Sequence, residues 1–203
     1  MKPNELRAAL PPAAVGWVDE AVSQVETDPG AIARLFPRAA RACGRVPLPG
    51  SSGWTADEAA RALLLAALPG DQVAAEADRL YRYGDADEKR AVLRALPLLP
   101  VGDTAVPLLH DALRTNDTRL VGAALGPYAA HLDAATWRQA VLKCVFMGLP
   151  LSIVDRLDER GDEELRVMLA GLAEERAAAG RPMAADAIGL LNRLSGTALR
   201  KEA

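Results

Sequence analysis

The feature that most constrains the fold is a series of five aspartates at near-regular intervals along the middle of the chain. They stand in the sequences PGDQ, YGDA, VGDT, TNDT and HLDA, at positions 71, 85, 103, 117 and 133. Each precedes apolar residues at helical spacing. An aspartate in that place can accept hydrogen bonds from the first-turn N–H groups and complement the helix dipole. The pattern therefore predicts a succession of short helices.

The spacing of these aspartates also indicates a repeat. Successive intervals of 14, 18, 14 and 16 residues place alternate aspartates 32, 32 and 30 residues apart. Such a period fits short antiparallel helix pairs stacked as in a HEAT-like helical repeat. Tandem caps also occur in irregular helical bundles, so both arrangements stay open. Alternation of polar with β-branched or aromatic residues is nearly absent, which makes the predicted fold class all-α.

Composition and length agree with one helical domain. Half of the residues are hydrophobic but only 4 % are aromatic, so Ala, Leu and Val must build most of the core. A chain of 203 residues suits a single domain. We expect N-terminal helices over 1–43, a Gly-, Pro- and Ser-rich loop over 44–54, helical repeats over 55–136, a C-terminal region over 137–196 and a frayed tail over 197–203. Thr55 and Glu58 have the spacing of a capping box at the start of the first repeat helix.

Charge and the metal-binding residue types point away from several functions. A net charge of −3 and a pI of about 5.5 predict no nucleic-acid binding. Cys43 and Cys144 lie far apart without a CxxC motif, and His110 and His131 lack ligand spacing. We therefore expect reduced thiols, no metal site and no cofactor. The longest apolar run, ALLLAALPG, is too short to span a bilayer, and the N-terminus has no signal-peptide core, so the expected location is the cytoplasm.

The most unusual segment is WRQAVLKCVFMGLPL, residues 137–151. On a helical wheel it is apolar on nearly every side, with a narrow polar seam that contains Lys143. Such a helix is expected to be buried. Arg138 falls inside the apolar arc, close to the N-terminus of the helix. We expect Cys144, on the Trp137 side, to pack as a small hydrophobe.

Two interpretations of this helix stay open. In the first it is a core helix in which Lys143 extends to the surface and Arg138 pairs with an acid. In the second, Arg138 and Lys143 face a pocket that binds an anionic ligand, and a desolvated lysine there could act as a base or nucleophile. The sequence VDRLDER, residues 154–160, superficially resembles acidic metal–diphosphate motifs. It lacks a second acidic cluster, and we interpret it as surface charge.

The C-terminal third resembles a known family. Three blocks carry the resemblance: WRQAVLKCVFMGLPL, then LDERGDEEL, then ERAAAGR. Together they are similar to the EboA-domain proteins of bacteria, and the region before them is similar more loosely. The family tends to have an aromatic residue after AGR, where this chain has AADAIGLLNRL. The resemblance implies a helical-repeat protein encoded beside a UbiA-like prenyltransferase, a TatD-like hydrolase, a sugar-isomerase-like barrel and a dehydroquinate-synthase-like cyclase.

That context implies a pathway that makes or exports a prenylated small molecule, and it supplies no catalytic residue for this chain. Our first hypothesis is a non-catalytic interaction or ligand-presenting protein, with partners among the proteins of the same gene cluster. The alternative is an enzyme or carrier that acts on a phosphorylated or prenylated intermediate. Its ligand-binding groups would be Arg138, Lys143, Glu175 and Arg181. A structural homodimer is the third hypothesis.

Overall fold

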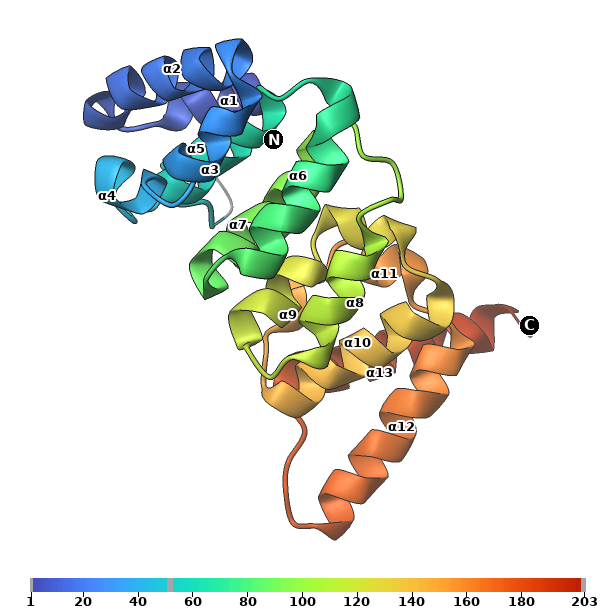
Figure 1. Ribbon diagram of the computed structural model, residues 1–203. Helices are drawn as coiled ribbons and strands as arrows, with labels where there is room; N and C mark the ends of the chain where they lie inside the picture. The colour runs from blue at the N-terminus through green and yellow to red at the C-terminus, as the bar shows by residue number, and fades with distance from the viewer. Residues whose placement is uncertain (1, 51–52, 202–203) are drawn as a thin grey trace. The chain divides into compact units, whose positions relative to one another are not determined.

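The computed structural model of the protein describes residues 2–50 and 53–201, and Figure 1 shows its ribbon. Within these residues the regular structure is helical, and the only β-type pairing is an isolated antiparallel bridge between Pro47 and Thr55. The predicted all-α class is therefore confirmed for the described part of the chain. The HEAT-like stacking of helix pairs stays a prediction.

The chain divides into two compact units, residues 1–114 and 115–203. The first contains α1 (Pro3–Ala9), α2 (Pro12–Thr27), η1 (Pro29–Ala31), α3 (Ile32–Leu35), α4 (Ala39–Cys43), α5 (Ala56–Ala66), α6 (Gly70–Tyr83), α7 (Ala86–Ala95), η2 (Leu96–Leu98) and α8 (Val106–Arg114). The second contains α9 (Thr118–Ala124), η3 (Pro127–His131), α10 (Ala134–Met147), η4 (Leu151–Ile153), α11 (Leu157–Arg160), α12 (Glu163–Ala178) and α13 (Ala185–Lys201). That the whole chain forms one domain stays a prediction.

Three of the five aspartates cap helices as predicted. Asp85 accepts from Glu88 N at 2.8 Å, Asp117 from Arg119 N at 2.9 Å, and Asp133 from Thr136 N at 2.9 Å. The capping prediction is wrong for the other two aspartates. Asp71 lies inside the first turn of α6, because the helix already begins at Gly70, and Asp103 lies in a turn before α8.

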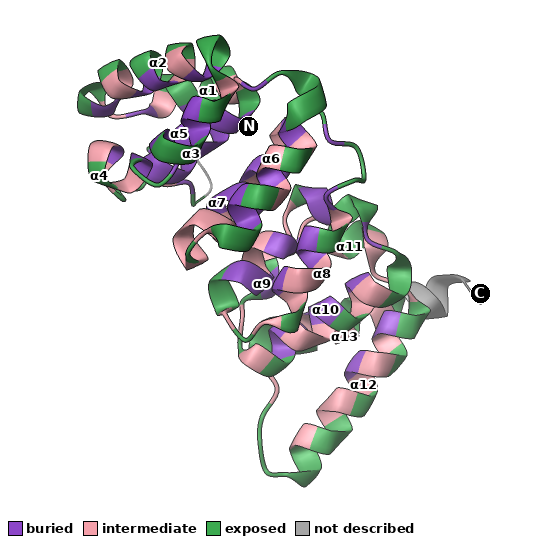
Figure 2. Cartoon of the chain, viewed as in Figure 1, coloured by how far each residue is buried: buried purple, intermediate pink, exposed green. Residues whose placement is uncertain are grey.

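Helix α5 is the centre of the first unit. It packs against α1, α2, α4, α6 and α7, and all residues from Ala56 to Leu65 are buried. Figure 2 colours the chain by burial. The helix begins where the capping box predicts, and Glu58 accepts a hydrogen bond from Thr55 N at 3.1 Å.

The burial of α5 includes three charged side chains: Asp57, Glu58 and Arg61, each 2 % exposed. Arg61 Nη1 donates to Asp57 Oδ2 at 2.7 Å, and its Nε donates to the carbonyl of Phe36 at 3.1 Å. Glu58 lies 2.8 Å from Arg90 Nη1 on α7. Burying a charge is costly unless it is paired and hydrogen-bonded. Arg61 and Asp57 meet that requirement, whereas Glu58 is paired with Arg90 but its Oε1 lacks a hydrogen bond.

Helix α10 is the centre of the second unit, where it packs against α9, α12 and η4. Its buried residues are Trp137, Ala140, Val141, Cys144 and Val145. The prediction that this helix is buried is thus confirmed for the Trp137 side. It is wrong for Phe146, which is 72 % exposed near the end of the helix.

Two segments of the chain form interrupted rather than continuous helices. Residues 29–43 form η1, α3 and α4, since Pro37 has no N–H to donate within the segment. Residues 151–161 form η4 and α11, separated at Arg156. At the C-terminus, α13 includes residues 197–201 of the predicted frayed tail, and residues 202–203 lie outside the described part.

Candidate ligand groove

The second unit carries an open groove of about 650 Å³ between the η4–α11 segment and α13. Its lining comprises Leu151, Ser152, Val154, Arg156, Leu157, Asp158, Glu159, Ala185, Asp186, Gly189 and Arg193. Leu151 and Val154 are buried and form an apolar floor, while the charged lining residues are exposed. This distribution gives the groove an apolar base and an ionic rim.

The local fold of the η4–α11 segment places two of the rim residues. Asp155 N donates to the carbonyl of Leu125 at 2.9 Å, which ties the segment to the end of α9. The next residue, Arg156, has φ 52° and ψ 34°, and it is the one non-glycine residue with positive φ in the described ranges. A left-handed residue costs about 1–2 kcal/mol. It turns the chain directly into α11 and brings Arg156 and Glu159 to the rim.

The rim is held by ion pairs across and along the groove. Arg193 of α13 lies 3.0 Å from Asp158 of α11, which joins the two walls. Arg156 Nε donates to Glu159 Oε2 at 2.6 Å, and this hydrogen bond raises the pKa of the guanidinium. The two hydrogen-bonded pairs thus hold their side chains in place at the rim.

Asp186 fixes the base of the groove. Its Oδ2 accepts a hydrogen bond from Leu151 N at 2.8 Å, which links the first turn of α13 to η4. The lining wall is thus held by a backbone contact in addition to the ion pairs. Two of the three acids of VDRLDER also make ion pairs, since Asp158 and Glu159 each pair with an arginine. Among the described residues no group of three His, Cys, Asp or Glu could hold a metal ion.

Arg138, the first predicted ligand residue, is paired with an acid. Its Nε donates to Asp162 Oδ1 at 2.9 Å and its Nη2 to Asp162 Oδ2 at 2.5 Å. Asp162 also caps α12 by accepting from Leu165 N at 3.0 Å. Hydrogen bonding to Arg138 lowers the pKa of Asp162. This is the arrangement expected if the helix is a core helix with a paired arginine.

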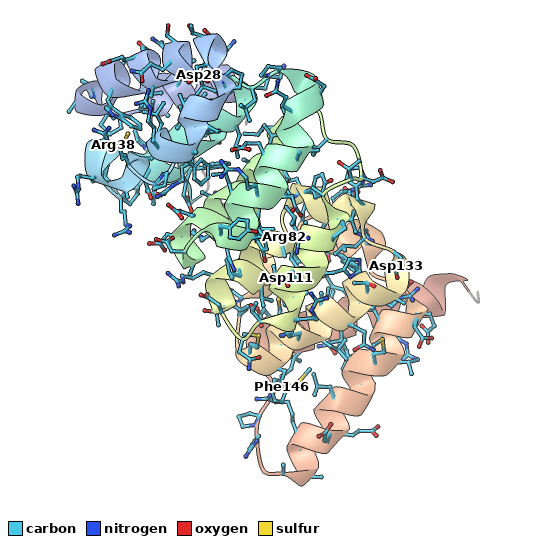
Figure 3. All side chains as sticks on the ribbon, viewed as in Figure 1. Asp28, Arg38, Arg82, Asp111, Asp133 and Phe146 are labelled. Atoms are coloured by element: carbon cyan, nitrogen blue, oxygen red, sulfur yellow. The ribbon has the colours of Figure 1, made fainter. Side chains whose placement is uncertain are left out.

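Lys143, the second predicted residue, is half-buried and engages the backbone. Its Nζ donates to the carbonyl of Thr115 at 2.7 Å. The ammonium therefore neither extends freely into solvent nor lines the groove. Figure 3 draws these side chains on the ribbon, with Phe146 labelled on the same helix.

Glu175 and Arg181 lie away from the other two residues. Both are exposed, one near the end of α12 and the other in the following loop. Glu175 is 13 residues beyond Asp162, the partner of Arg138, which corresponds to about 20 Å along a helix. The structure thus does not bring the four predicted residues into one site. A ligand role for any of them stays a prediction.

Sequence reasoning missed Arg156, Arg193 and Asp186. The first two looked like ordinary surface charges, because neither the left-handed turn at Arg156 nor the approach of α13 has a sequence signature in this chain. Gly189 is the one weak signal, since a glycine inside a helix often marks a packing or binding requirement. It lies on the α13 wall of the groove.

Both thiols are free and buried, which agrees with the packing expected for Cys144. Burial raises the pKa of Cys144 to about 12 and that of Cys43 to about 11. A thiol in that state is a poor nucleophile, because the thiolate is the reactive form. Cys144 accordingly packs as a small hydrophobe in the core of the second unit.

These features define an all-helical protein with an apolar-floored, ionic-rimmed groove in its C-terminal unit. The model of one family, described as "Metabolite traffic protein EboA", matches residues 37–191. The chain belongs to the EboA family, which confirms the resemblance seen in its C-terminal blocks. No curated protein and no solved structure matches it. No helix in the described residues has both the length and the apolar character needed to cross a membrane.

Proposed function

We propose that this protein is a non-catalytic, ligand-presenting component of a cytoplasmic bacterial pathway that makes or exports a prenylated small molecule. In this proposal the helices form HEAT-like stacked pairs, the groove of the second unit holds the molecule, and the protein presents it to other proteins of the same gene cluster. The family description, metabolite traffic, supports a role with a metabolite.

The groove carries the proposal. Its volume of about 650 Å³ suits a small molecule, since ligand pockets are commonly about 300–1,000 Å³. The buried Leu151 and Val154 offer contacts to a hydrocarbon chain, and the rim offers hydrogen bonds to a polar end. An amphiphilic molecule, apolar along one part and polar at the other, matches both surfaces.

The state of the rim favours binding over proton transfer. The carboxylates of Asp158 and Glu159 already accept hydrogen bonds from arginines. Carboxylate oxygens that already accept hydrogen bonds from arginine N–H groups are less accessible to a proton of a bound molecule. In the alternative role as a carrier of a phosphorylated intermediate, a phosphate would replace a rim carboxylate on Arg156 or Arg193, because it offers an arginine more charge and more acceptor oxygens.

A titration with defined probes tests the proposal. Farnesyl diphosphate and farnesol share the prenyl chain and differ in charge, and binding of each is measured by calorimetry below the critical micelle concentration. We expect both to bind, with the diphosphate tighter. Arg193→Gln should weaken the binding of farnesyl diphosphate and leave the binding of farnesol unchanged. A wild-type protein that binds neither probe contradicts the proposed ligand class.

A further inference from the structure

The first unit carries an acid-free basic segment that the proposed function does not use. Residues 29–56 contain no Asp or Glu and four arginines: Arg34, Arg38, Arg41 and Arg45. All four are exposed. Residues 1–114 hold 13 basic and 15 acidic side chains, a net charge of −2. With these four arginines set aside, the rest of the unit carries −6, so its charge is strongly uneven.

Three of the arginines share one face of the η1–α3–α4 segment. The segment is nearly continuous: Phe36 N donates to Ile32 O at 2.9 Å, and Ala42 N donates to Arg38 O at 3.0 Å on the far side of Pro37. Positions 34, 38 and 41 follow the i, i+4, i+7 spacing of a helix face. The opposite face is buried through Ile32, Leu35, Phe36, Ala39 and Cys43. The arginines consequently form one exposed row, which we call the arginine stripe (Arg34, Arg38, Arg41).

The stripe is weakly neutralised within its own unit. Arg34 donates to the uncharged side chain of Gln24 at 2.7 Å. The side chains of Arg38 and Arg41 have no hydrogen-bond or ion-pair partner in the part of the chain that the structure describes, and Figure 3 labels Arg38 at the surface. Arg45, beyond the helix end at Gly44, lies 2.9 Å from Asp87. Other arginines of this unit differ: Arg79, Arg82 and Arg114 each pair with an acid on the same helix.

Exposed apolar groups lie among these charges. Ala33 and Pro37 are exposed between the arginines, and Val46 is 48 % exposed just after Arg45. No exposed aromatic side chain lies in the described residues of the 29–56 segment to serve as the centre of a protein interface or to stack on a base. Guanidinium groups with only small aliphatic neighbours suit contact with the phosphates of anionic lipid headgroups.

We propose that the arginine stripe, with Arg45 and Val46 beside it, binds the surface of an anionic phospholipid bilayer. The guanidinium groups contact lipid phosphates, and Val46 enters the headgroup region. The acidic remainder of the unit is repelled by the same surface, so the unit binds in one orientation. Three or four charges give a weak and reversible association that salt weakens, because the Debye length falls to about 8 Å at physiological ionic strength.

Sedimentation with vesicles tests this proposal. The vesicles contain 40 mol % phosphatidylglycerol in phosphatidylcholine, or phosphatidylcholine alone, and the full chain is used at low salt, where each arginine near the surface is worth about fivefold in partitioning. The variant Arg34→Gln/Arg38→Gln/Arg41→Gln should lose about two orders of magnitude on the anionic vesicles. The same three sites changed to Lys should retain most binding, because lipid attraction needs charge rather than bidentate geometry.

The control variant is Arg79→Gln/Arg82→Gln/Arg114→Gln, which changes the net charge equally. It should bind anionic vesicles nearly as the wild type does. Equal losses in both Gln triples, or no preference of the wild type for anionic vesicles, overturn the proposal. Binding to a 20-base-pair DNA duplex without binding to vesicles also overturns it and assigns the stripe to nucleic acid. Circular dichroism of each variant verifies that the helices are intact.

Discussion

Helices α5 and α12 each contain an arginine–carboxylate pair, but the two pairs lie in opposite environments. In α5, Arg61 and Asp57 are four residues apart and 2–3 % exposed. In α12, Arg166 and Glu163 are three residues apart and their side chains are 29 % and 60 % exposed. Only Leu165 and Leu169 of α12 are buried, and Figure 2 shows most of this helix as intermediate or exposed. An arginine–carboxylate pair is therefore structural or incidental according to its burial, which its spacing does not reveal.

The largest expected effect comes from breaking the pair in α5. Arg61→Met leaves the Asp57 carboxylate buried without its counter-ion and should cost about 3–5 kcal/mol of unfolding free energy, measured by urea denaturation. Arg166→Met in α12 is the matched control and should cost less than about 1 kcal/mol. Similar losses in the two variants contradict the contrast. The double change Asp57→Leu/Arg61→Met should recover much of the loss.

A smaller effect is expected for Arg138, whose pair with Asp162 lies between these extremes. Their side chains are 20 % and 41 % exposed. Arg138→Met should cost about 1–2 kcal/mol, because the remaining carboxylate is partly solvated and still caps α12. Urea denaturation beside Arg61→Met provides the comparison. A loss as large as that of Arg61→Met shows that solvent does not reach Asp162 as its exposure indicates.

Lys143→Met should have a smaller effect still, about 1 kcal/mol, since it removes one hydrogen bond to the Thr115 carbonyl and retains the aliphatic stem. Thermal denaturation measures it, with Lys89→Met in the first unit as a lysine control. A gain in stability indicates that the ammonium is held at a cost, as in a ligand pocket.

The Arg138–Asp162 pair should make the stability of the protein depend on pH. Arg138 lowers the pKa of Asp162, so the pair stabilises the fold fully above the unfolded-state pKa of about 3.9. This stabilisation is lost as the pH falls through the folded-state pKa. The stability difference between wild type and Asp162→Asn should be constant from pH 7 to 5 and shrink at lower pH. A difference that grows on acidification contradicts the sign of the shift.

The smallest effects are expected at Glu175 and Arg181. Both are exposed, and Glu175→Gln and Arg181→Gln should each change the unfolding free energy by less than about 0.5 kcal/mol. If either variant nevertheless reduces binding of farnesyl diphosphate tenfold in calorimetry, that residue belongs to a ligand site despite its distance from the groove.

Much of the fold could be predicted from local patterns. Local sequence was enough to predict the caps at Asp85, Asp117 and Asp133 and the start of α5 at Thr55, because capping depends on a few neighbouring residues. The breaks at Pro37 and Arg156 were not foreseen, since a helical pattern continues through both. The full burial of α5 was also missed, because Asp57, Glu58 and Arg61 look like a solvated face until the arginines and carbonyls around them are known.

Less of the candidate site could be predicted. The pairing of Arg138 with an acid followed from its place in the apolar arc of α10. The groove did not, because its walls come from segments about 35 residues apart in sequence, as the Arg193–Asp158 hydrogen bond illustrates. The arginine stripe was not predicted, because the net charge of −3 describes the whole chain and not residues 29–56.

The central claim, that the groove of the second unit holds a small molecule, is tested most directly by native mass spectrometry of protein purified from its own host. Gly189→Leu places a side chain in the groove, and Gly171→Leu makes the same change on α12, where a Cβ meets nothing within 4 Å. Leucine favours a helix over glycine by about 1 kcal/mol, so both variants should fold. We predict an additional bound mass on the wild type and on Gly171→Leu that is absent from Gly189→Leu. Retention of that mass by Gly189→Leu, or its absence from the wild type, contradicts the claim.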